Sequence, residues 1–548
     1  MNQFLRRTLL CCLAPFLALS AQAQGAISAA VPEDSRLDDG LANAKKDVAV
    51  FVRMEDQLFP RGGDYERFCS ERSGNAKRLE LREEVIATLK AKSHASFENV
   101  QAALEGLVET EEVTSVRRYW IVNGFACRAS AKGCAALADL PGVAFVYRQR
   151  YAPQEGGDSS EEFEEDAELT ALYRKLMEHP QDDSSEPFES AGLEVPWNLQ
   201  AVGAEEAWNE HGVTGKGVVI AVLDDGMMTV PALLPGLWRN TEEKLNGKDD
   251  DGNGLVDDVF GYDFAKDTPY SVTPKGHRHG TLCASVMAAR PTPGDAKGEG
   301  SELAEKPMAA GVAPRAKIMP LVGNGRLRAY EYALEKGADI ISMSYTLEPA
   351  KMGQYRGLFR AAHEHLSAAG IVSLGGAGNY AKSRPEGLQI GSTKDVPCVI
   401  AAAGVGPDLT VTSFSSRGPV SWEGIRFYDG AEAASVKPNV TTCNSGFPMW
   451  TLPEIWTAAK ADRVKNVVRE DSEGYALVIG PRGNSFAGPH VAGVAALMLE
   501  ADPELPVWRL QEILESTCRD MGEPGRDTAY GAGMVQASQA VEAVLRED

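Results

Sequence analysis

Residues 483–493 read Gly-Asn-Ser-Phe-Ala-Gly-Pro-His-Val-Ala-Gly, and an apolar run that reaches Met498 follows them at once. This pattern predicts a buried helix whose first turn carries Ser485. A hydroxyl at a helix N-terminus lies among free backbone N–H groups, where a developing negative charge is favoured. For a lone serine of this kind, a tight turn before a core helix is the better interpretation. Its meaning therefore depends on whether a base and an acid occur elsewhere in the chain.

The second half of the chain, from about residue 195, alternates strand-like and helix-like segments. Short runs of apolar and β-branched residues recur at 218–223, 318–321, 340–343, 371–374 and 399–403. Continuous runs of this type are typical of strands that are buried on both faces. Helical patterns lie between them, so we predict an α/β fold: a doubly wound parallel sheet with helices on both faces. Such sheets place their functional sites at the carboxyl ends of the strands.

Two chemically active residues follow this rule. Asp224 ends the first of these apolar runs, and His279 opens another apolar helix. An aspartate, a histidine and a serine at element ends of one sheet fit the orienting acid, the base and the nucleophile of acyl transfer. Each residue alone is a weak signal, but the ordered set, with each member in its own local pattern, is specific.

With these three motifs the chain resembles the subtilisin-like serine proteases, whose catalytic residues also come in the order Asp, His, Ser. The resemblance covers roughly residues 197–535. It extends to further segments of the family pattern, at 311–314 (Gly-Val-Ala-Pro), 377–379 (Ala-Gly-Asn), 414–419 (Phe-Ser-Ser-Arg-Gly-Pro) and 530–535 (Tyr-Gly-Ala-Gly-Met-Val).

The resemblance implies a role for each matching residue. Ser485 is expected to be the nucleophile and His279 the general base, with Asp224 holding the imidazole in one tautomer. Asn379 is expected to join the Ser485 N–H in binding the oxyanion of the tetrahedral intermediate. The expected activity is that of a serine endopeptidase that hydrolyses peptide bonds of protein or peptide substrates through an acyl-enzyme intermediate.

Some residues depart from the family pattern. Asn484 stands where relatives have Thr before the nucleophile, and Phe486 stands where they usually have Met after it. Residues 344–346 read Ser-Tyr-Thr where Ser-Leu-Gly normally lines the substrate strand, and insertions occupy residues 290–308 and 446–479. Cys283 matches a position at which some relatives carry a free thiol beneath the histidine.

The N-terminal part divides into three segments. Residues 1–23 combine two arginines, an apolar stretch and Ala21-Gln22-Ala23, which is the pattern of a secretory signal peptide. The pattern of residues 24–151 predicts a small α+β ferredoxin-like domain in the order β-α-β-β-α-β, with an amphipathic helix over residues 79–92. Residues 152–191 are predicted to form an acidic linker. The resemblance implies that this small domain is an inhibitory propeptide, which would act as an intramolecular inhibitor of the peptidase domain at 192–548. We therefore expect a secreted or periplasmic enzyme, made as an autoinhibited precursor and without a membrane anchor after removal of the signal peptide.

Composition narrows the possible partners. The 548 residues carry a formal charge of −23, which argues against nucleic acid as a partner. Seven of the nine cysteines lie outside the predicted signal peptide. Because seven is odd, at least one thiol is free or pairs between chains.

An acidic segment resembles half of a calcium-binding loop. Asp249, Asp251, Asn253 and Asp257 follow Ca²⁺-loop spacing, but Phe260 stands where an EF-hand would place its bidentate glutamate. The spacing is compatible with a structural calcium site and with a plain acidic turn. The expected chemistry itself requires no cofactor.

Two other classes of function compete with the endopeptidase hypothesis. A catalytically silent binding protein could have the same fold, although all four chemical positions are retained here. A lipase or esterase of the α/β-hydrolase type would need G-x-S-x-G and the order Ser, Asp, His, and the sequence has neither.

Overall fold

The computed structural model describes residues 35–74, 76–149, 166–181, 188–291, 295–296, 307–429, 436–452, 467–470 and 474–546. The predicted signal peptide lies outside these residues. Within them, no helix combines the length and the apolar character that a membrane-spanning segment needs.

The N-terminal domain is a four-stranded antiparallel sheet in the order β2-β3-β1-β4, with helices in its crossovers. Its elements are β1 (Val48–Met54), α2 (Asp64–Glu71), α3 (Arg78–Glu109), β2 (Val113–Tyr119), β3 (Gly124–Ala129), α4 (Ala131–Ala138) and β4 (Val143–Arg148). Apart from α2, this is the β-α-β-β-α-β order of the prediction. The sequence pattern indicated only the first half of α3, from residue 79 to 92.

The larger domain is built on a seven-stranded parallel sheet in the order β14-β13-β12-β11-β5-β10-β7. Its strands are β5 (Val219–Asp224), β7 (Tyr262–Asp263), β10 (Lys317–Val322), β11 (Ile340–Met343), β12 (Val372–Gly376), β13 (Ile400–Val405) and β14 (Val440–Cys443). The five apolar runs of the sequence coincide with five of these strands, and the parallel α/β class is confirmed.

Helices cover both faces of this sheet. One face carries α8 (Arg278–Ala288), α13 (Ala487–Ala501), α14 (Val507–Ser516) and α15 (Ala537–Leu545), and the other carries α9 (Leu327–Glu335) and α11 (Arg356–Ala368). The alternation along β5 separates the two cores. Ile220 and Val222 pack with α8 and α13, whereas Ala221 and Leu223 pack with α9 and α11.

The insertions add a second, smaller sheet. It has the order β15-β17-β16-β9, formed by β9 (Asp295–Ala296), β15 (Pro448–Thr451), β16 (Val467–Glu470) and β17 (Ala476–Ile479). The two insertions therefore pair with each other, β9 against β16, through residues that are more than 170 positions apart in the sequence. Shorter elements complete the fold: α5 (Ala167–Met177), α6 (Trp197–Ala201), α7 (Ala204–His211), β6 (Met227–Met228), β8 (Val272–Thr273) and α10 (Pro349–Met352).

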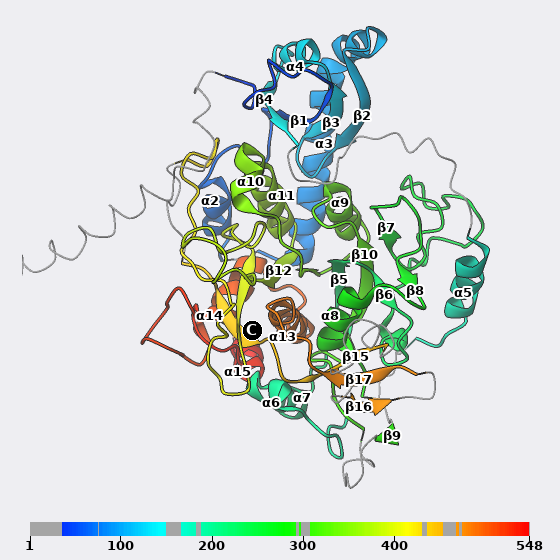
Figure 1. The fold of residues 1–548 in the computed structure, drawn as a ribbon, viewed down its shortest axis with the longest axis vertical. Helices are drawn as coiled ribbons and strands as arrows, with labels where there is room; N and C mark the ends of the chain where they lie inside the picture. Colours follow the sequence, from blue (N-terminus) through cyan, green and yellow to red (C-terminus); the bar gives the residue numbers. More distant parts are fainter. Residues whose placement is uncertain are drawn as a thin grey trace, which may run out of the picture.

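The N-terminal domain packs against the α9 and α11 face. Figure 1 shows this domain, blue to cyan, at one end of the molecule, with α3 running from it along the larger domain. Residues from both domains share one apolar core, including Phe51 and Leu81 from the N-terminal domain and Phe359 and Leu366 from α11. Within the acidic linker, α5 packs on the larger domain through Tyr173, whose hydroxyl donates to Pro269 O at 2.9 Å.

Candidate active site

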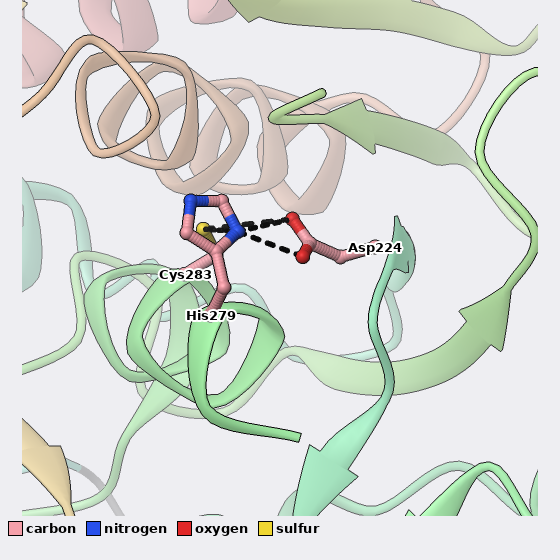
Figure 2. Close-up of side chains that lie close together, drawn as sticks. All are labelled: Asp224, His279 and Cys283. Atoms are coloured by element: carbon pink, nitrogen blue, oxygen red, sulfur yellow. Dashed lines mark hydrogen bonds and ion pairs between the residues drawn. The ribbon is translucent and has the colours of Figure 1, made fainter. Parts of the chain in front are cut away.

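Asp224 and His279 meet at the carboxyl edge of the parallel sheet. Asp224 is the last residue of β5 and is 4% exposed, while His279 lies in the first turn of α8. Nδ1 of His279 lies 2.7 Å from Oδ1 and 2.9 Å from Oδ2 of Asp224 (Figure 2). Because a carboxylate only accepts hydrogen bonds, Nδ1 is the donor and Nε2 is left free to accept a proton.

Asp225 fixes the start of α8 against the end of β5. Its carboxylate accepts hydrogen bonds from the backbone N–H groups of His279 (3.2 Å) and Gly280 (2.7 Å). A Cβ at Gly280 would lie 2.1 Å from Gly226 O, so only glycine allows this close approach of strand end and helix.

Cys283 lies beneath the imidazole, one helical turn after His279 (Figure 2). Its Sγ is 4.0 Å from Nδ1 of His279 and 3.5 Å from the carbonyl oxygen of Ser485. Burial raises the pKa of the Cys283 thiol, so the sulfur is uncharged at neutral pH. The pKa of His279 is raised by the neighbouring Cys283 sulfur and by Asp224, and with a neutral thiol the Asp224 carboxylate is the effective partner.

Ser485 lies in a turn immediately before α13. The turn is closed by Phe486 N–H to Gly483 O and Ala487 N–H to Asn484 O, each 3.0 Å, and α13 begins at Ala487. Ser485 therefore precedes the helix, whereas the sequence pattern predicted it inside the first turn. Its hydroxyl donates to Ser344 O at 3.4 Å, and the Ser344 hydroxyl donates back to Ser485 O at 2.7 Å.

The serine and the histidine are neighbours without a direct hydrogen bond in this part of the described chain. Cys283 contacts both residues, and the Phe486 ring centroid is 6.1 Å from that of His279. Hydrogen bonds between nucleophile and base are often long in a substrate-free enzyme and shorten when substrate binds.

Asn379 follows β12 and lies beside the serine turn. Its Oδ1 accepts the backbone N–H of Asn484 at 2.8 Å, which fixes the orientation of the amide and leaves Nδ2 as a donor. The Asn484 side chain is fully buried and bonds Gly378 O, Ser415 Oγ and Asn444 Nδ2. Asn484 and Asn444 thus hold the segment that carries Asn379, and Asn444 had no signal in the sequence.

The acidic segment lies at the edge of the larger domain, next to α9. Carboxylate oxygens of Asp249, Asp251 and Glu243 lie within 4.8 Å of one another. Asp257 instead accepts hydrogen bonds from the backbone N–H groups of Asn246 (2.8 Å) and Gly247 (2.9 Å).

Two buried oxygens beside this cluster have no hydrogen-bond partner among the described residues: Glu243 Oε2 and Asp258 Oδ1. Burial and the neighbouring Asp258 raise the pKa of Glu243 to about 8. Glu243 precedes the acidic run, so the loop spacing gave no reason to include it.

All seven cysteines outside the predicted signal peptide are free thiols in the structure.

Comparison with known proteins gives one family match and several relatives. The family described as "Subtilase family" matches residues 215–533. Fervidolysin from Fervidobacterium pennivorans is 27% identical over 378 residues, which cover 64% of this chain and 44% of the relative. Bacillopeptidase F from Bacillus subtilis is 23% identical over 495 residues (84% and 29%), and a calcium-dependent protease from a Nostoc species is 26% identical over 376 residues (62% and 48%). In each alignment, the matched region is less than half of the relative's length.

Proposed function

The chain belongs to the subtilase family of serine-type endopeptidases, and from that premise we propose that it hydrolyses peptide bonds with Ser485, His279 and Asp224 as catalytic triad. The observation that carries the proposal is the bidentate contact of Asp224 with His279 Nδ1 at the sheet edge where the Ser485 turn lies.

In the proposed reaction, His279 Nε2 takes the proton of the Ser485 hydroxyl as Oγ attacks the substrate carbonyl carbon. Asp224 holds the tautomer with hydrogen on Nδ1 and stabilises the imidazolium that forms. The Ser485 N–H and Asn379 Nδ2 donate to the oxyanion. His279 then gives its proton to the leaving amine, and water attacks the acyl-enzyme with His279 again as base.

Labelling by a fluorophosphonate probe tests this proposal. We expect one probe per chain, attached at Ser485, and casein hydrolysis that is lost in Ser485→Ala. Removal of the nucleophile in subtilisin lowers turnover by about 10⁶. A folded wild-type chain that neither reacts with the probe nor cleaves casein would support the catalytically silent binding protein.

We also propose that residues 24–151 inhibit the peptidase domain in the precursor and that residues 1–23 direct export. Glu331 on α9 accepts the backbone N–H groups of Trp120 (2.6 Å) and Ile121 (2.9 Å), and His365 Nδ1 on α11 donates to Ile121 O (2.6 Å). These bonds dock the β2–β3 hairpin on both helices. In this proposal, cleavage within the linker, between about residues 151 and 190, produces the mature enzyme.

A calcium ion fits the acidic cluster, in a ligand set that differs from the predicted one. The unpartnered Glu243 oxygen, together with Asp249 and Asp251, would hold it through hard oxygen ligands, in competition with Lys336, which pairs with Asp251. Asp257 serves the loop backbone instead. A bound cation would neutralise the facing carboxylates and stabilise the fold, without taking part in peptide hydrolysis.

Calorimetry across pH tests the calcium site. Because Glu243 has a pKa of about 8, Ca²⁺ must displace its proton at pH 7, and affinity should rise as pH increases from 6.5 to 8.5. Glu243→Gln should abolish this pH dependence and the stabilisation by Ca²⁺, whereas Asp408→Asn, on an exposed loop, should change neither. Equal melting temperatures with Ca²⁺ and with chelator would leave a plain acidic turn.

A further inference from the structure

A fully buried lysine lies behind the active-site edge of the sheet. Lys394 is 0% exposed, its ammonium donates to Tyr345 O, and its Nζ lies 4.9 Å from the centre of the Tyr345 ring. No carboxylate among the described residues pairs with it, because the adjacent Asp395 is paired with Arg356 at 2.6 Å. Burial lowers the pKa of Lys394 to about 7.

Burying an ammonium without a carboxylate partner is costly, so packing alone is a poor reason for a lysine here. The surroundings also accommodate its stem. A Cβ at Gly375, on β12, would lie 3.0 Å from Lys394 Cδ and 2.2 Å from Met343 O. The lysine thus crosses β12 at glycine and reaches the segment that follows β11.

That segment contacts the nucleophile directly. Ser344 accepts the Ser485 hydroxyl through its carbonyl oxygen (3.4 Å) and donates its own hydroxyl to Ser485 O (2.7 Å). The next carbonyl along the chain, that of Tyr345, is the acceptor of Lys394. The Ser344–Tyr345 peptide is therefore held from one side by the Ser485 turn and from the other by Lys394.

We propose that Lys394 is a positioning residue for the serine-protease reaction: it fixes the Tyr345 carbonyl and through it Ser344, whose hydroxyl donates to Ser485 O and so holds the backbone of the Ser485 turn. The proposal rests on the proposed function. Both the ammonium and the neutral amine can donate to Tyr345 O, so this role persists across the titration of Lys394.

Other groups around the lysine define its electrostatic setting. The carboxylates of Asp395 and of Asp224, at the end of β5, favour the charged form of Lys394. The Lys394 charge in turn disfavours protonation of His363 on α11. The Tyr345 hydroxyl is bonded to Tyr330 OH at 2.6 Å. The Lys394 charge therefore opposes protonation of His279 at the other side of Asp224, which gives a second effect that can be measured apart from the hydrogen bond.

Two substitutions separate these effects. Lys394→Met removes donor and charge at similar length, whereas Lys394→Gln retains a donor and removes the charge. We expect Lys394→Met to lower kcat per active site about tenfold with little change in KM, and Lys394→Gln to recover most of that loss. In both variants the acid limb of the kcat/KM profile should move to higher pH, because loss of a nearby positive charge raises the pKa of His279.

Lys437 provides the matched control. It is also fully buried, it donates to Val399 O and to Asn439 Oδ1 (2.7 Å), and burial lowers its pKa to about 8. It lies between β13 and β14 rather than against the Ser485 turn. Lys437→Met should lower the melting temperature. Its kcat per active site should stay within about twofold of wild type, and the acid limb of its kcat/KM profile within about 0.2 pH units, on the order of the error of such profiles.

Active sites are counted by fluorophosphonate titration, so that loss of folded protein is not mistaken for slower chemistry. A wild-type enzyme that fails to titrate would refute the proposed function before Lys394 is tested. With a titrating wild type, the positioning role is overturned by a Lys394→Met kcat within twofold of wild type, by an equal loss in Lys437→Met, or by a Lys394→Gln kcat as low as that of Lys394→Met. If Lys394→Met does not fold, Lys394→Leu takes its place under the same criteria, because leucine also removes both the donor and the charge.

Discussion

The two faces of the central sheet are built from different kinds of residue. The buried residues of α13 are almost all small or aliphatic, with His490 as the exception. On the opposite face, α11 buries Arg356, Arg360, His363, Glu364 and His365. Arg360 and Glu364 form an ion pair of 2.7 Å in which each side chain is 1% exposed.

This difference follows what covers each face. The α8 and α13 face is covered by the peptidase domain and by α5 of the linker, and the Ser485 turn and His279 lie on it. Much of the α9 and α11 face is covered by the N-terminal domain, which in our proposal leaves after cleavage. Charged side chains that are paired in the docked state can be hydrated when that domain departs, whereas an apolar face would be left exposed to water.

Apart from Ser485 itself, the largest expected effect on the α13 side is at Asn379. Asn379→Ala removes the Nδ2 donor while leaving the serine turn closed by its own backbone bonds. In subtilisin, removal of this kind of donor lowers kcat by about 10²–10³, and we expect a loss in that range with little change in KM. Steady-state kinetics per titrated active site measures it. The control is Gln389→Ala. Gln389 accepts the Arg417 N–H on a neighbouring loop, and its replacement should leave kcat near the wild-type value.

Equal kinetics of wild type and Asn379→Ala would mean that the oxyanion is bound elsewhere, and the polar network through Asn484 would then need another explanation.

The next effect concerns the docked face, where Arg78 at the start of α3 reaches the amino edge of the sheet. Its guanidinium donates to Asp339 Oδ1 (2.8 Å), Gly370 O (3.1 Å) and Pro503 O (2.8 Å), and the residue is 3% exposed. Breaking a buried charge pair on one side costs roughly 2–5 kcal/mol. Arg82 lies 3.5 Å from Asp339 and compensates in part for the lost pair. When residues 24–151 are added to the mature enzyme as a separate inhibitor, we therefore expect Arg78→Met in that segment to raise the inhibition constant about 10²-fold.

Lys90 gives the matched control for that measurement. Its pair with Glu335 on α9 is 2.6 Å long but half-exposed, with side-chain exposures of 48% and 33%. Exposed pairs contribute about 0–1 kcal/mol, so Lys90→Met should change the inhibition constant about fivefold or less. Comparable losses in both variants would show that burial of charge does not distinguish this interface.

The sequence predicts best where one local pattern decides the structure. The core strands were recognisable because runs such as residues 218–223 are apolar without alternation, and the site residues because each stands in its own short motif. The roles of Ser485, His279 and Asp224 remain predictions, although the structure brings Asp224 and His279 into contact.

Long-range features were missed for identifiable reasons. The inward face of α3 continues past residue 92 through Ser93, Ser96, Val100 and Leu104, and its two buried serines interrupt the apolar period. The ion pair of Arg78 with Asp339 joins residues 261 positions apart, and no local sequence pattern indicates it. Glu243 is one of many acidic residues in the sequence, and only its burial beside Asp258 sets it apart.

The smallest expected effect concerns His490, the exception among the buried residues of α13. His490 is fully buried: its Nδ1 donates to Phe486 O (2.8 Å), and its Nε2 accepts from Asn198 Nδ2 (3.0 Å), so the ring must be neutral. Burial lowers its pKa to about 4, below the value of about 6.5 in an unfolded chain. The unfolded state therefore takes up the proton first as pH falls, and the stability that His490 contributes is complete above pH 6.5 and is lost between pH 6.5 and about 4.

Urea unfolding of His490→Gln, in the Ser485→Ala background to prevent autolysis, measures this contribution. At pH 7.5 we expect the variant to be less stable than its parent, because Gln cannot reproduce both hydrogen bonds. At pH 5 the parent should have lost about 2 kcal/mol relative to the variant, which corresponds to 1.5 pH units below the unfolded pKa. A difference between parent and His490→Gln that stays constant from pH 7.5 to 5 would mean that the folded and unfolded chains take up the His490 proton at the same pH, and the face beneath Ser485 would then accommodate a buried charge at pH 5, as the α11 face accommodates charges.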